Sequence, residues 1–332
     1  MTVFVRPKAV GWILGGALGA MALVLAWFFL QAYPLGGEGR LVRITVHPGD
    51  SLSVIAGELH RAGVIANPLA FRIDLLLGAP TVYPGTYQFH QRSSFAVVKG
   101  VLAAPLVTVT PGLTLHEVAL QVAAREGATY ADHFLADAAS LATSSPFHPA
   151  GSLEGLIGVG QYRITPQLTP RRLLGEMVAA FDAQAASLGL DPSTTRAGLS
   201  AYQLITAASI VDKEGYYPRN MPKVARVIYN RLARGGPLQM DATVLYALGM
   251  DGGTVTHAML TTKSPYNTYL VAGLTPTPIC TVSRDALRAV LNPPPGPWLY
   301  FTVVNRSGTE AFATTFAQQL ANERIGAANG VR

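Results

Sequence analysis

The chain has 332 residues, of which 49% are hydrophobic and 13% are charged, so it is long enough for two or three domains and is not disordered. Its formal net charge is +6, but the basic residues are spread thinly, which argues against a nucleic-acid-binding protein. The single cysteine, Cys280, excludes an intramolecular disulfide, and the seven histidines lack the spacing of metal ligands. We therefore expect neither a metal nor a cofactor.

The N-terminal region contains a long stretch, residues 9–32, without any charged side chain. As a helix this stretch is long enough to cross the ~30 Å hydrocarbon layer of a membrane. Arg6 and Lys8 precede it and the first charge after it is Glu38, so the positive-inside rule places the N-terminus in the cytoplasm. A cleaved signal peptide is the alternative, although its apolar region usually spans only ~7–15 residues. The predicted segments are a cytoplasmic N-terminus at 1–8, a transmembrane helix at 9–32 and a linker at 33–42.

A strand, a Pro-Gly turn and an amphipathic helix occur twice in succession, first from Ile44 and again from Val107. The first copy, with a second helix that Asn67-Pro68 opens, resembles a LysM-like module, which we expect at 43–105. Modules of the LysM type bind glycans that contain N-acetylglucosamine, so the resemblance implies cell-wall binding. The alternative is a spacer that only positions the next domain, predicted at 106–332.

Charged residues cluster at the end of an apolar helix that is predicted to open with a capping box at Ser200. Asp212 and Glu214 are two residues apart, hence on different sides of the helix, so one carboxylate acts or neither does. A glutamate at the end of an apolar helix is partly desolvated, which raises its pKa and suits a proton donor for glycosidic cleavage. The alternative is a surface carboxylate paired with Lys213 or Arg219.

Further candidates follow this helix along the chain. Asp241 is explained as the N-cap of the next predicted helix. The segment Ser264 to Tyr269 combines tyrosines with an amide, which suits stacking on sugar rings and bonding to an N-acetyl group, although a core strand is equally compatible with it. The candidate substrate-binding residues are Tyr266, Asn267, Tyr269, Gln239 and Glu154.

Several motifs occur in one order along nearly the whole chain, from the apolar N-terminal stretch to about Phe316: PGD, YPGTY, LEG, ASIVDKE, VIYNRL, LQMDATVLYALG, SPYNTY and WLYF. In this set the chain resembles the YceG-like family of membrane-anchored endolytic murein transglycosylases. The resemblance implies an α+β fold class, with an N-terminal transmembrane helix, a LysM-like subdomain and a mixed α/β lytic transglycosylase catalytic domain.

The resemblance also implies a site and a reaction. The family's catalytic glutamate is the second acid of a (D/E)-K-E motif, which is Glu214 here, with Asp212 in the first, structural position. The expected reaction is non-hydrolytic cleavage of the MurNAc-GlcNAc β-1,4 bond of peptidoglycan, with the MurNAc 6-hydroxyl attacking C1 to leave a 1,6-anhydro end. The implied location is the inner membrane with a periplasmic catalytic domain, and the implied partner is a peptidoglycan synthase (penicillin-binding protein).

The chain departs from the family pattern in three segments: Gly158–Gln161, Thr275–Thr281 and Glu310–Ala311, where a family histidine is replaced. These departures keep two other functions open. One is a membrane-anchored glycan-binding scaffold with little catalytic activity. The other is an ordinary glycosidase that uses Glu214 and Asp241 as a pair.

Overall fold

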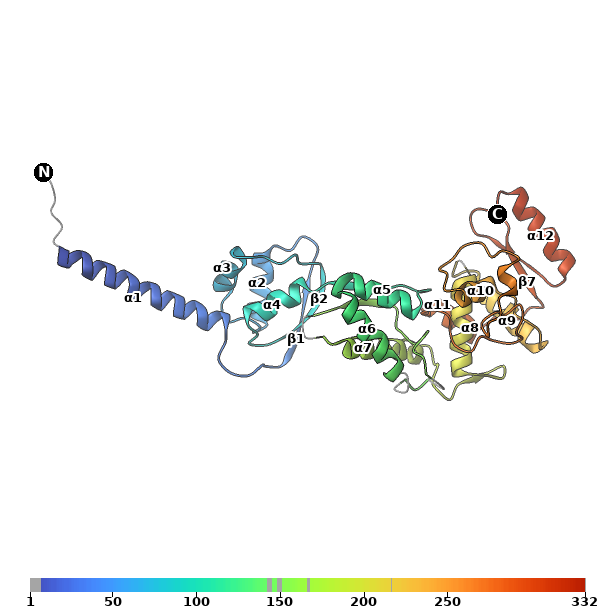
Figure 1. Ribbon diagram of the computed structural model, residues 1–332, viewed down its shortest axis with the longest axis horizontal. Helices are drawn as coiled ribbons and strands as arrows, with labels where there is room; N and C mark the ends of the chain where they lie inside the picture. The colour runs from blue at the N-terminus through green and yellow to red at the C-terminus, as the bar shows by residue number, and fades with distance from the viewer. Residues whose placement is uncertain (1–6, 142–144, 148–150, 166–167, 216, 332) are drawn as a thin grey trace. The chain divides into compact units, whose positions relative to one another are not determined.

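The computed structural model describes residues 7–141, 145–147, 151–165, 168–215 and 217–331, with side chains from residue 16 onward. The chain divides into two compact units. Unit 1 is Met1–Pro105 with Ile164–Gln167, and unit 2 is Leu106–Arg163 with Leu168–Arg332 (Figure 1). Both combine helices with small antiparallel sheets, so the predicted α+β class is confirmed.

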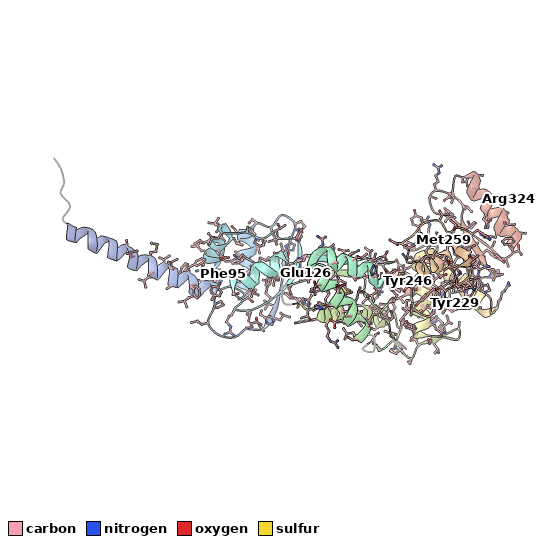
Figure 2. All side chains as sticks on the ribbon, viewed as in Figure 1. Phe95, Glu126, Tyr229, Tyr246, Met259 and Arg324 are labelled. Atoms are coloured by element: carbon pink, nitrogen blue, oxygen red, sulfur yellow. The ribbon has the colours of Figure 1, made fainter. Side chains whose placement is uncertain are left out.

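Unit 1 is built on a two-stranded antiparallel sheet whose strands are far apart in the sequence. Its elements are α1 (Pro7–Ala32), β1 (Leu41–Val46), α2 (Leu52–Arg61), α3 (Pro68–Leu76), β2 (Gly85–His90) and α4 (Phe95–Ala103). β1 pairs antiparallel with β2, in a register that runs from Leu41 opposite His90 to Val46 opposite Gly85. Buried and exposed residues alternate along both strands, which gives the sheet one face toward the core. Phe95, labelled in Figure 2, is 1% exposed in that core.

The helices of unit 1 begin where the sequence places their caps. Ser51 accepts a hydrogen bond from the Val54 N–H at the start of α2, and Asn67 caps α3 with Pro68 as its first residue. The strand, turn and helices predicted from the first repeat are therefore present. A relationship to LysM modules stays a prediction.

The N-terminal helix α1 ends against the core of unit 1. Ala32 is buried, and the ring of Phe28 lies edge-on to that of Phe95 with centroids 6.3 Å apart. Among the residues that the structure describes, none of the helices is long and apolar enough to span a membrane. The predicted transmembrane span at 9–32 is therefore not confirmed.

Unit 2 begins with a second two-stranded antiparallel sheet, whose strands are also far apart in the sequence, and with the helices around it. The elements are β3 (Leu106–Val109), α5 (Leu115–Glu126), α6 (Ala128–Leu141), β4 (Gly160–Arg163) and α7 (Pro170–Ser187). β3 pairs antiparallel with β4, from Leu106 opposite Arg163 to Val109 opposite Gly160. Thr114 and Glu117 form a reciprocal capping box at the start of α5. The second copy of the repeat thus folds as a strand, a turn and a helix.

The centre of unit 2 is α8 (Ala201–Glu214), which is buried along almost its whole length. α8 packs against α9 (Met221–Ala233), α10 (Asp241–Ala247) and α11 (Arg284–Leu291). Ser200 and Gln203 form the capping box predicted at its start, and Gly215 follows its last residue. The N-cap prediction for Asp241 is wrong, because Met240 occupies that position and Asp241 is the first helical residue.

The C-terminal part is a hairpin followed by a helix: β7 (Tyr300–Val303), β8 (Glu310–Ala313) and α12 (Phe316–Ala328). The strands pair antiparallel, from Tyr300 opposite Ala313 to Val303 opposite Glu310. All four residues of β7 are partly buried. α12 covers this hairpin within the orange and red end of the chain (Figure 1).

Candidate active site

Glu214 is the last residue of α8, and the next residue, Gly215, packs closely against both α8 and α9. The Gly215 N–H donates to the Val211 carbonyl at 2.7 Å. A Cβ at Gly215 would lie 2.9 Å from Cγ of Met221, so only glycine fits this approach of α8 and α9. The Glu214 side chain therefore projects from a rigid support.

The carboxyl group of Glu214 lies at the N-terminus of another helix, α10. Its Oε1 accepts a hydrogen bond of 3.0 Å from the backbone N–H of Ala242. Burial raises the pKa of Glu214 to about 7, with a smaller contribution from the charge of Asp241, while the Ala242 hydrogen bond and Arg231 act in the opposite direction. Near neutral pH both protonation states are accessible, as a group that first donates and then accepts a proton requires.

Asp212 has a different and structural environment. Its two oxygens accept hydrogen bonds from the N–H and the hydroxyl of Ser283, at 2.6 and 2.7 Å, at the start of α11. Burial raises the pKa of Asp212 to about 6 against the effect of these hydrogen bonds. The prediction that helical spacing separates Asp212 from Glu214 is confirmed by these separate partners.

The basic neighbours in sequence bond elsewhere. Lys213 pairs with Asp251 at 3.2 Å, and Arg219 donates to the Ser307 carbonyl at 2.7 Å. Among the described residues, neither of them forms an ion pair with Glu214. The structure therefore does not contain the alternative, in which Glu214 is a surface carboxylate paired with Lys213 or Arg219.

Three polar side chains interact electrostatically with Glu214, namely those of Asp241, Tyr269 and Arg231. The Tyr269 hydroxyl donates to Oδ1 of Asp241 at 2.6 Å. Arg231 donates to the carbonyls of Leu238 and Leu299, and its guanidinium lies 5.3 Å from the centroid of the Tyr300 ring. Burial raises the pKa of Tyr269 and lowers that of Arg231, and the charge of Glu214 contributes an upward effect on both, so these groups lie close enough to interact with it.

Gln239 lies in the loop that leads into α10, with an exposed side chain. Its φ of 50° is in the left-handed region, which is unusual for a residue other than glycine, and its N–H donates to the Thr268 carbonyl at 2.9 Å. Such strain is typical of positions whose side chain has a role in a site. Of the candidate binding residues, Tyr269 is the one whose pKa the charge of Glu214 affects, and Gln239 is joined through its backbone N–H to the residue before Tyr269.

The other candidate binding residues lie in a more buried setting. Asn267 is fully buried; its amide donates to the carbonyls of Leu260 and Thr262 and accepts from the Tyr269 N–H. These hydrogen bonds fix the loop that carries Tyr269. A substrate contact of Asn267 stays a prediction.

Glu154 and Tyr266 belong to a second cluster. Both oxygens of Glu154 accept from the Leu115 N–H at the start of α5, at 3.0 and 3.2 Å, and the Tyr246 hydroxyl donates to it at 3.3 Å. The rings of Tyr246 and Tyr266 are 4.9 Å apart, and the Tyr266 hydroxyl bonds that of Thr277. Burial raises the pKa of Glu154 to about 7. This cluster joins α5 to α10, and its binding role remains untested.

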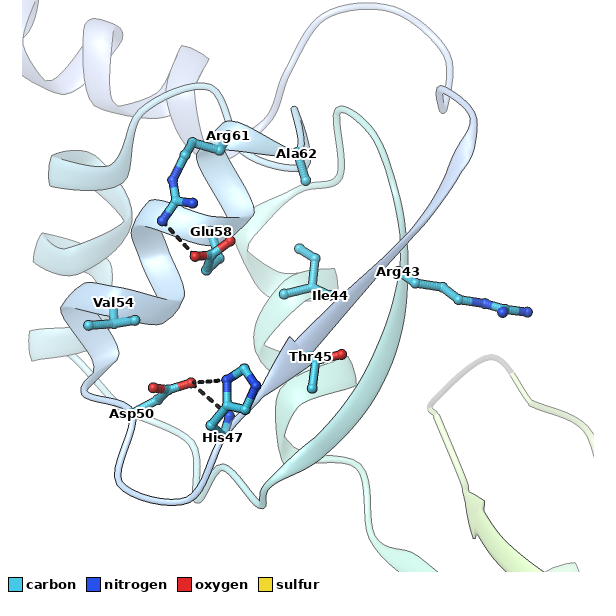
Figure 3. A pocket seen from close by; sticks show the side chains of 9 residues that line it. All are labelled: Arg43, Ile44, Thr45, His47, Asp50, Val54, Glu58, Arg61 and Ala62. Carbon is cyan, nitrogen blue, oxygen red and sulfur yellow. Dashed lines mark hydrogen bonds and ion pairs between the residues drawn. The ribbon is translucent and has the colours of Figure 1, made fainter.

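Unit 1 contains a separate pocket of about 480 Å³ between β1 and α2 (Figure 3). Its charged side chains largely pair with each other. Arg61 bonds Glu58 at 2.6 Å, and Nδ1 of the His47 ring lies 3.5 Å from Oδ2 of Asp50, which also accepts from the backbone N–H of His47 at 2.7 Å. Arg43 points away from these groups in Figure 3. None of the candidate catalytic or binding residues is among those that line this pocket.

Three polar groups that interact with Glu214 are not predicted from the sequence. Arg231 is part of the VIYNRL motif, which was noted without a role for that residue. Glu310 was noted only as a departure from the family pattern, yet it is 9% exposed and the charge of Glu214 acts on it. The Ala242 N–H carries no signal in sequence, because any residue type supplies a backbone donor.

Comparisons with known proteins show which family the chain is similar to. The model of the YceG-like family matches residues 44–325. The chain is 28% identical over 303 residues to the endolytic murein transglycosylase of Bacillus subtilis (strain 168), covering 83% of this chain and 82% of that protein. It is 28% identical over 312 residues to the protein of the same name from Streptococcus pneumoniae (strain ATCC BAA-255 / R6), and spans 56% of that longer protein.

Among solved structures, a YceG-like protein from Listeria monocytogenes matches with a TM-score of 0.59 and 26% sequence identity. The match covers 85% of this chain and 99% of that one. Since the family match extends over residues 44–325, most of the sequence, this chain belongs to the YceG-like family.

Proposed function

We propose that this protein is a peptidoglycan lytic transglycosylase that cleaves MurNAc-GlcNAc β-1,4 bonds within glycan strands and leaves 1,6-anhydro-MurNAc ends. The observation that carries the proposal is the position of Glu214, whose Oε1 accepts from the Ala242 N–H at 3.0 Å in the first turn of α10 and whose pKa is raised by burial to about 7. The relatives named endolytic murein transglycosylase support the substrate class.

The proposed reaction needs one group that both gives and takes a proton. Protonated Glu214 donates to the leaving glycosidic oxygen while the bond from C1 to that oxygen breaks. The MurNAc 6-hydroxyl oxygen forms the new bond to C1, and its proton goes to the Glu214 carboxylate. The glutamate returns to its starting form without water, and the Ala242 N–H stabilises it while it is charged.

The internal nucleophile explains why one carboxylate is enough. A hydrolase of the usual kind needs a second carboxylate about 5–9.5 Å away to act as a nucleophile or to activate water. A hydroxyl within the same sugar replaces that group at high effective concentration. Terminating or trimming nascent strands is the biological outcome that we propose.

A hydrolase is the second candidate, because Asp241 lies next to the Ala242 donor and its charge acts on Glu214. Digestion of purified sacculi followed by mass spectrometry separates the two functions. We expect anhydro-muropeptides with the wild-type protein and none with Glu214→Gln. Reducing ends in their place would support the hydrolase, and binding without soluble product would support a scaffold.

We further propose that residues 9–32 anchor the chain in the inner membrane and hold the catalytic unit in the periplasm, beside newly made glycan and a peptidoglycan synthase. The absence of charge in that stretch and the basic residues before it support this. The test is carbonate extraction of membranes from cells that express the full chain or a chain starting at residue 33. Release of the full chain by carbonate would contradict anchoring.

A further inference from the structure

The backbone around Glu154 is packed against a segment that is bound to α8. Gly155 has a φ of 75°, and a Cβ at this position would collide with Cβ of Pro278, so only glycine fits here. The next residue of that segment, Ile279, donates its N–H to the buried hydroxyl of Ser209 on α8 at 3.0 Å. The position of Glu154 is therefore set by a segment that α8 itself holds.

The carboxyl group of Glu154 reaches from there to α5 and α10. The side chain is buried, and both oxygens accept from the Leu115 N–H at the start of α5, at 3.0 and 3.2 Å. Oε2 also accepts from the hydroxyl of Tyr246 on α10, at 3.3 Å. A buried carboxyl group is stable where protein donors satisfy it, so these contacts hold α5 and α10 to one point.

The ring of Tyr246 is supported on its other side. It packs against the ring of Tyr266, with centroids 4.9 Å apart, and the Tyr266 hydroxyl bonds that of Thr277 at 2.9 Å. Thr277 directly precedes Pro278 in the segment that α8 holds. The contacts therefore form a closed circuit from the backbone at Glu154, through this segment and the two rings, back to the Glu154 carboxyl group.

The helix α10 connects this circuit to Glu214. The Ala242 N–H, in the first turn of α10, donates to Oε1 of Glu214 at 3.0 Å. A helix as short as α10 is about 10 Å long and moves as one rigid rod, so a shift at Tyr246 changes the position of Ala242. The Thr243 hydroxyl also bonds that of Thr268 at 2.8 Å, so loss of the Tyr246 contact should loosen α10 without releasing it.

We propose that Glu154 is a positioning residue for the reaction, which holds α10 so that the Ala242 N–H reaches the Glu214 carboxyl group. This inference rests on the proposed function of Glu214. In this role Glu154 acts through its hydrogen bond with Tyr246 and touches neither the substrate nor the reacting atoms. Its effect on turnover passes through the backbone donor that stabilises Glu214 while it is charged.

The direct test is a pH titration of the full chain, labelled with ¹⁵N-alanine, in which NMR follows the Ala242 amide proton. In the wild type its chemical shift should follow the titration of Glu214, because it donates to that carboxyl group. Tyr246→Phe removes only the hydroxyl that bonds Glu154, and it should reduce this response by at least about half, since a hydrogen bond weakens steeply as its geometry worsens. Glu154→Ala should have the same effect.

The matched control is Tyr130→Phe. It removes a half-buried tyrosine hydroxyl on α6 that donates to the Leu168 carbonyl at 2.8 Å. The chemical change and the loss of one hydrogen bond are the same, but the contact does not involve α10. The response of the Ala242 amide should therefore equal that of the wild type.

Turnover of soluble glycan gives a second readout, the separation of kcat from KM. Tyr246→Phe and Glu154→Ala should lower kcat about 3- to 10-fold and leave KM within about twofold, because a misplaced catalytic group slows the reaction without weakening glycan binding. Glu154→Gln should restore kcat to within about twofold of wild type. Its amide oxygen, placed where Oε2 lies, can accept from both Leu115 and Tyr246.

A wild-type response of the Ala242 amide in both Tyr246→Phe and Glu154→Ala would overturn the inference, and so would an equal loss of response in Tyr130→Phe. If Glu154→Ala does not fold, Tyr246→Phe decides alone. The NMR response requires no turnover. Failure of the proposed function therefore shows separately, as a lack of anhydro products from a wild-type protein whose Ala242 amide still follows Glu214.

Discussion

The backbone N–H of Ala242 lies 3.0 Å from Oε1 of Glu214, so the last residue of α8 meets the first turn of α10. Two opposing effects meet at this contact. Burial disfavours the carboxylate, whereas a backbone donor at a helix N-terminus favours it. Burial is the larger of the two effects, so the pKa of Glu214 is raised to about 7.

Replacement of Glu214 by Gln should abolish turnover with little effect on folding. The amide oxygen of Gln still accepts from the Ala242 N–H, but the side chain can no longer transfer a proton. We expect release of soluble muropeptides to fall by at least about 10²-fold. Thermal unfolding by circular dichroism should give a Tm close to that of the wild type.

The matched control for this variant is Glu176→Gln, which should retain full turnover. Residual activity of Glu214→Gln within a few-fold of wild type would contradict a role as the acid and base. A large loss of Tm would instead mean that Glu214 is a structural residue.

Asp212→Ala should show the opposite pattern. The substitution removes two hydrogen bonds to Ser283 at the start of α11. Loss of these two hydrogen bonds, which hold the N-cap residue Ser283, costs about 1–2 kcal/mol of stability. The measurement is urea unfolding, combined with turnover per folded molecule, which we expect to stay within a few-fold of wild type.

Asp212→Asn is the informative companion, because its amide oxygen keeps one of the two acceptors. Its stability should fall between those of wild type and Asp212→Ala. Loss of turnover in both variants at full folding would show that the first acid of the motif takes part in the chemistry.

Interactions between residues that are close in the sequence can be predicted for this site, whereas those between distant segments cannot. The limits of α8 follow from Ser200 and Gly215, because capping is local, and the separation of Asp212 from Glu214 follows from helical geometry. The contact with Ala242 and the effect of the Glu214 charge on Glu310 join segments far apart in the chain. Such contacts are set by tertiary packing, which local patterns do not contain.

The wrong N-cap at Asp241 has the same origin. Its residue type and the following apolar periodicity are typical of a cap, which is why the sequence predicts one. In the structure the carboxylate of Asp241 accepts from the Tyr269 hydroxyl instead, at 2.6 Å. A partner from a distant loop thus replaced the local hydrogen bond.

Stability should decrease as pH rises from about 4.5 to about 7. Burial raises the pKa values of Glu154, Glu214 and Glu310 from 4.5 to about 7, so the folded state binds their protons more tightly than the unfolded state. The stabilisation is fully present below the unfolded value and is lost as pH passes the folded one. Each group contributes at most about 1.4 kcal/mol per pH unit in this window.

The measurement is the free energy of unfolding in urea at several pH values between 5 and 8, compared with Glu154→Gln. This variant keeps an acceptor for the Leu115 N–H and removes one titrating group, so its curve should be flatter. Parallel curves for wild type and variant would contradict the raised pKa of Glu154.

Gln239→Ala should weaken binding of the glycan without changing stability. Alanine at a φ of 50° retains the backbone strain, so the Tm should stay close to wild type. Loss of one hydrogen bond worth about 0.5–1.5 kcal/mol raises KM by roughly 2- to 12-fold. If the contact is the same in the ground state and the transition state, kcat is unchanged.

Gln239→Gly separates backbone strain from glycan binding. It should show the same KM as Gln239→Ala but gain up to about 1 kcal/mol of stability. An unchanged KM in both variants would show that the exposed amide of Gln239 makes no contact with the glycan.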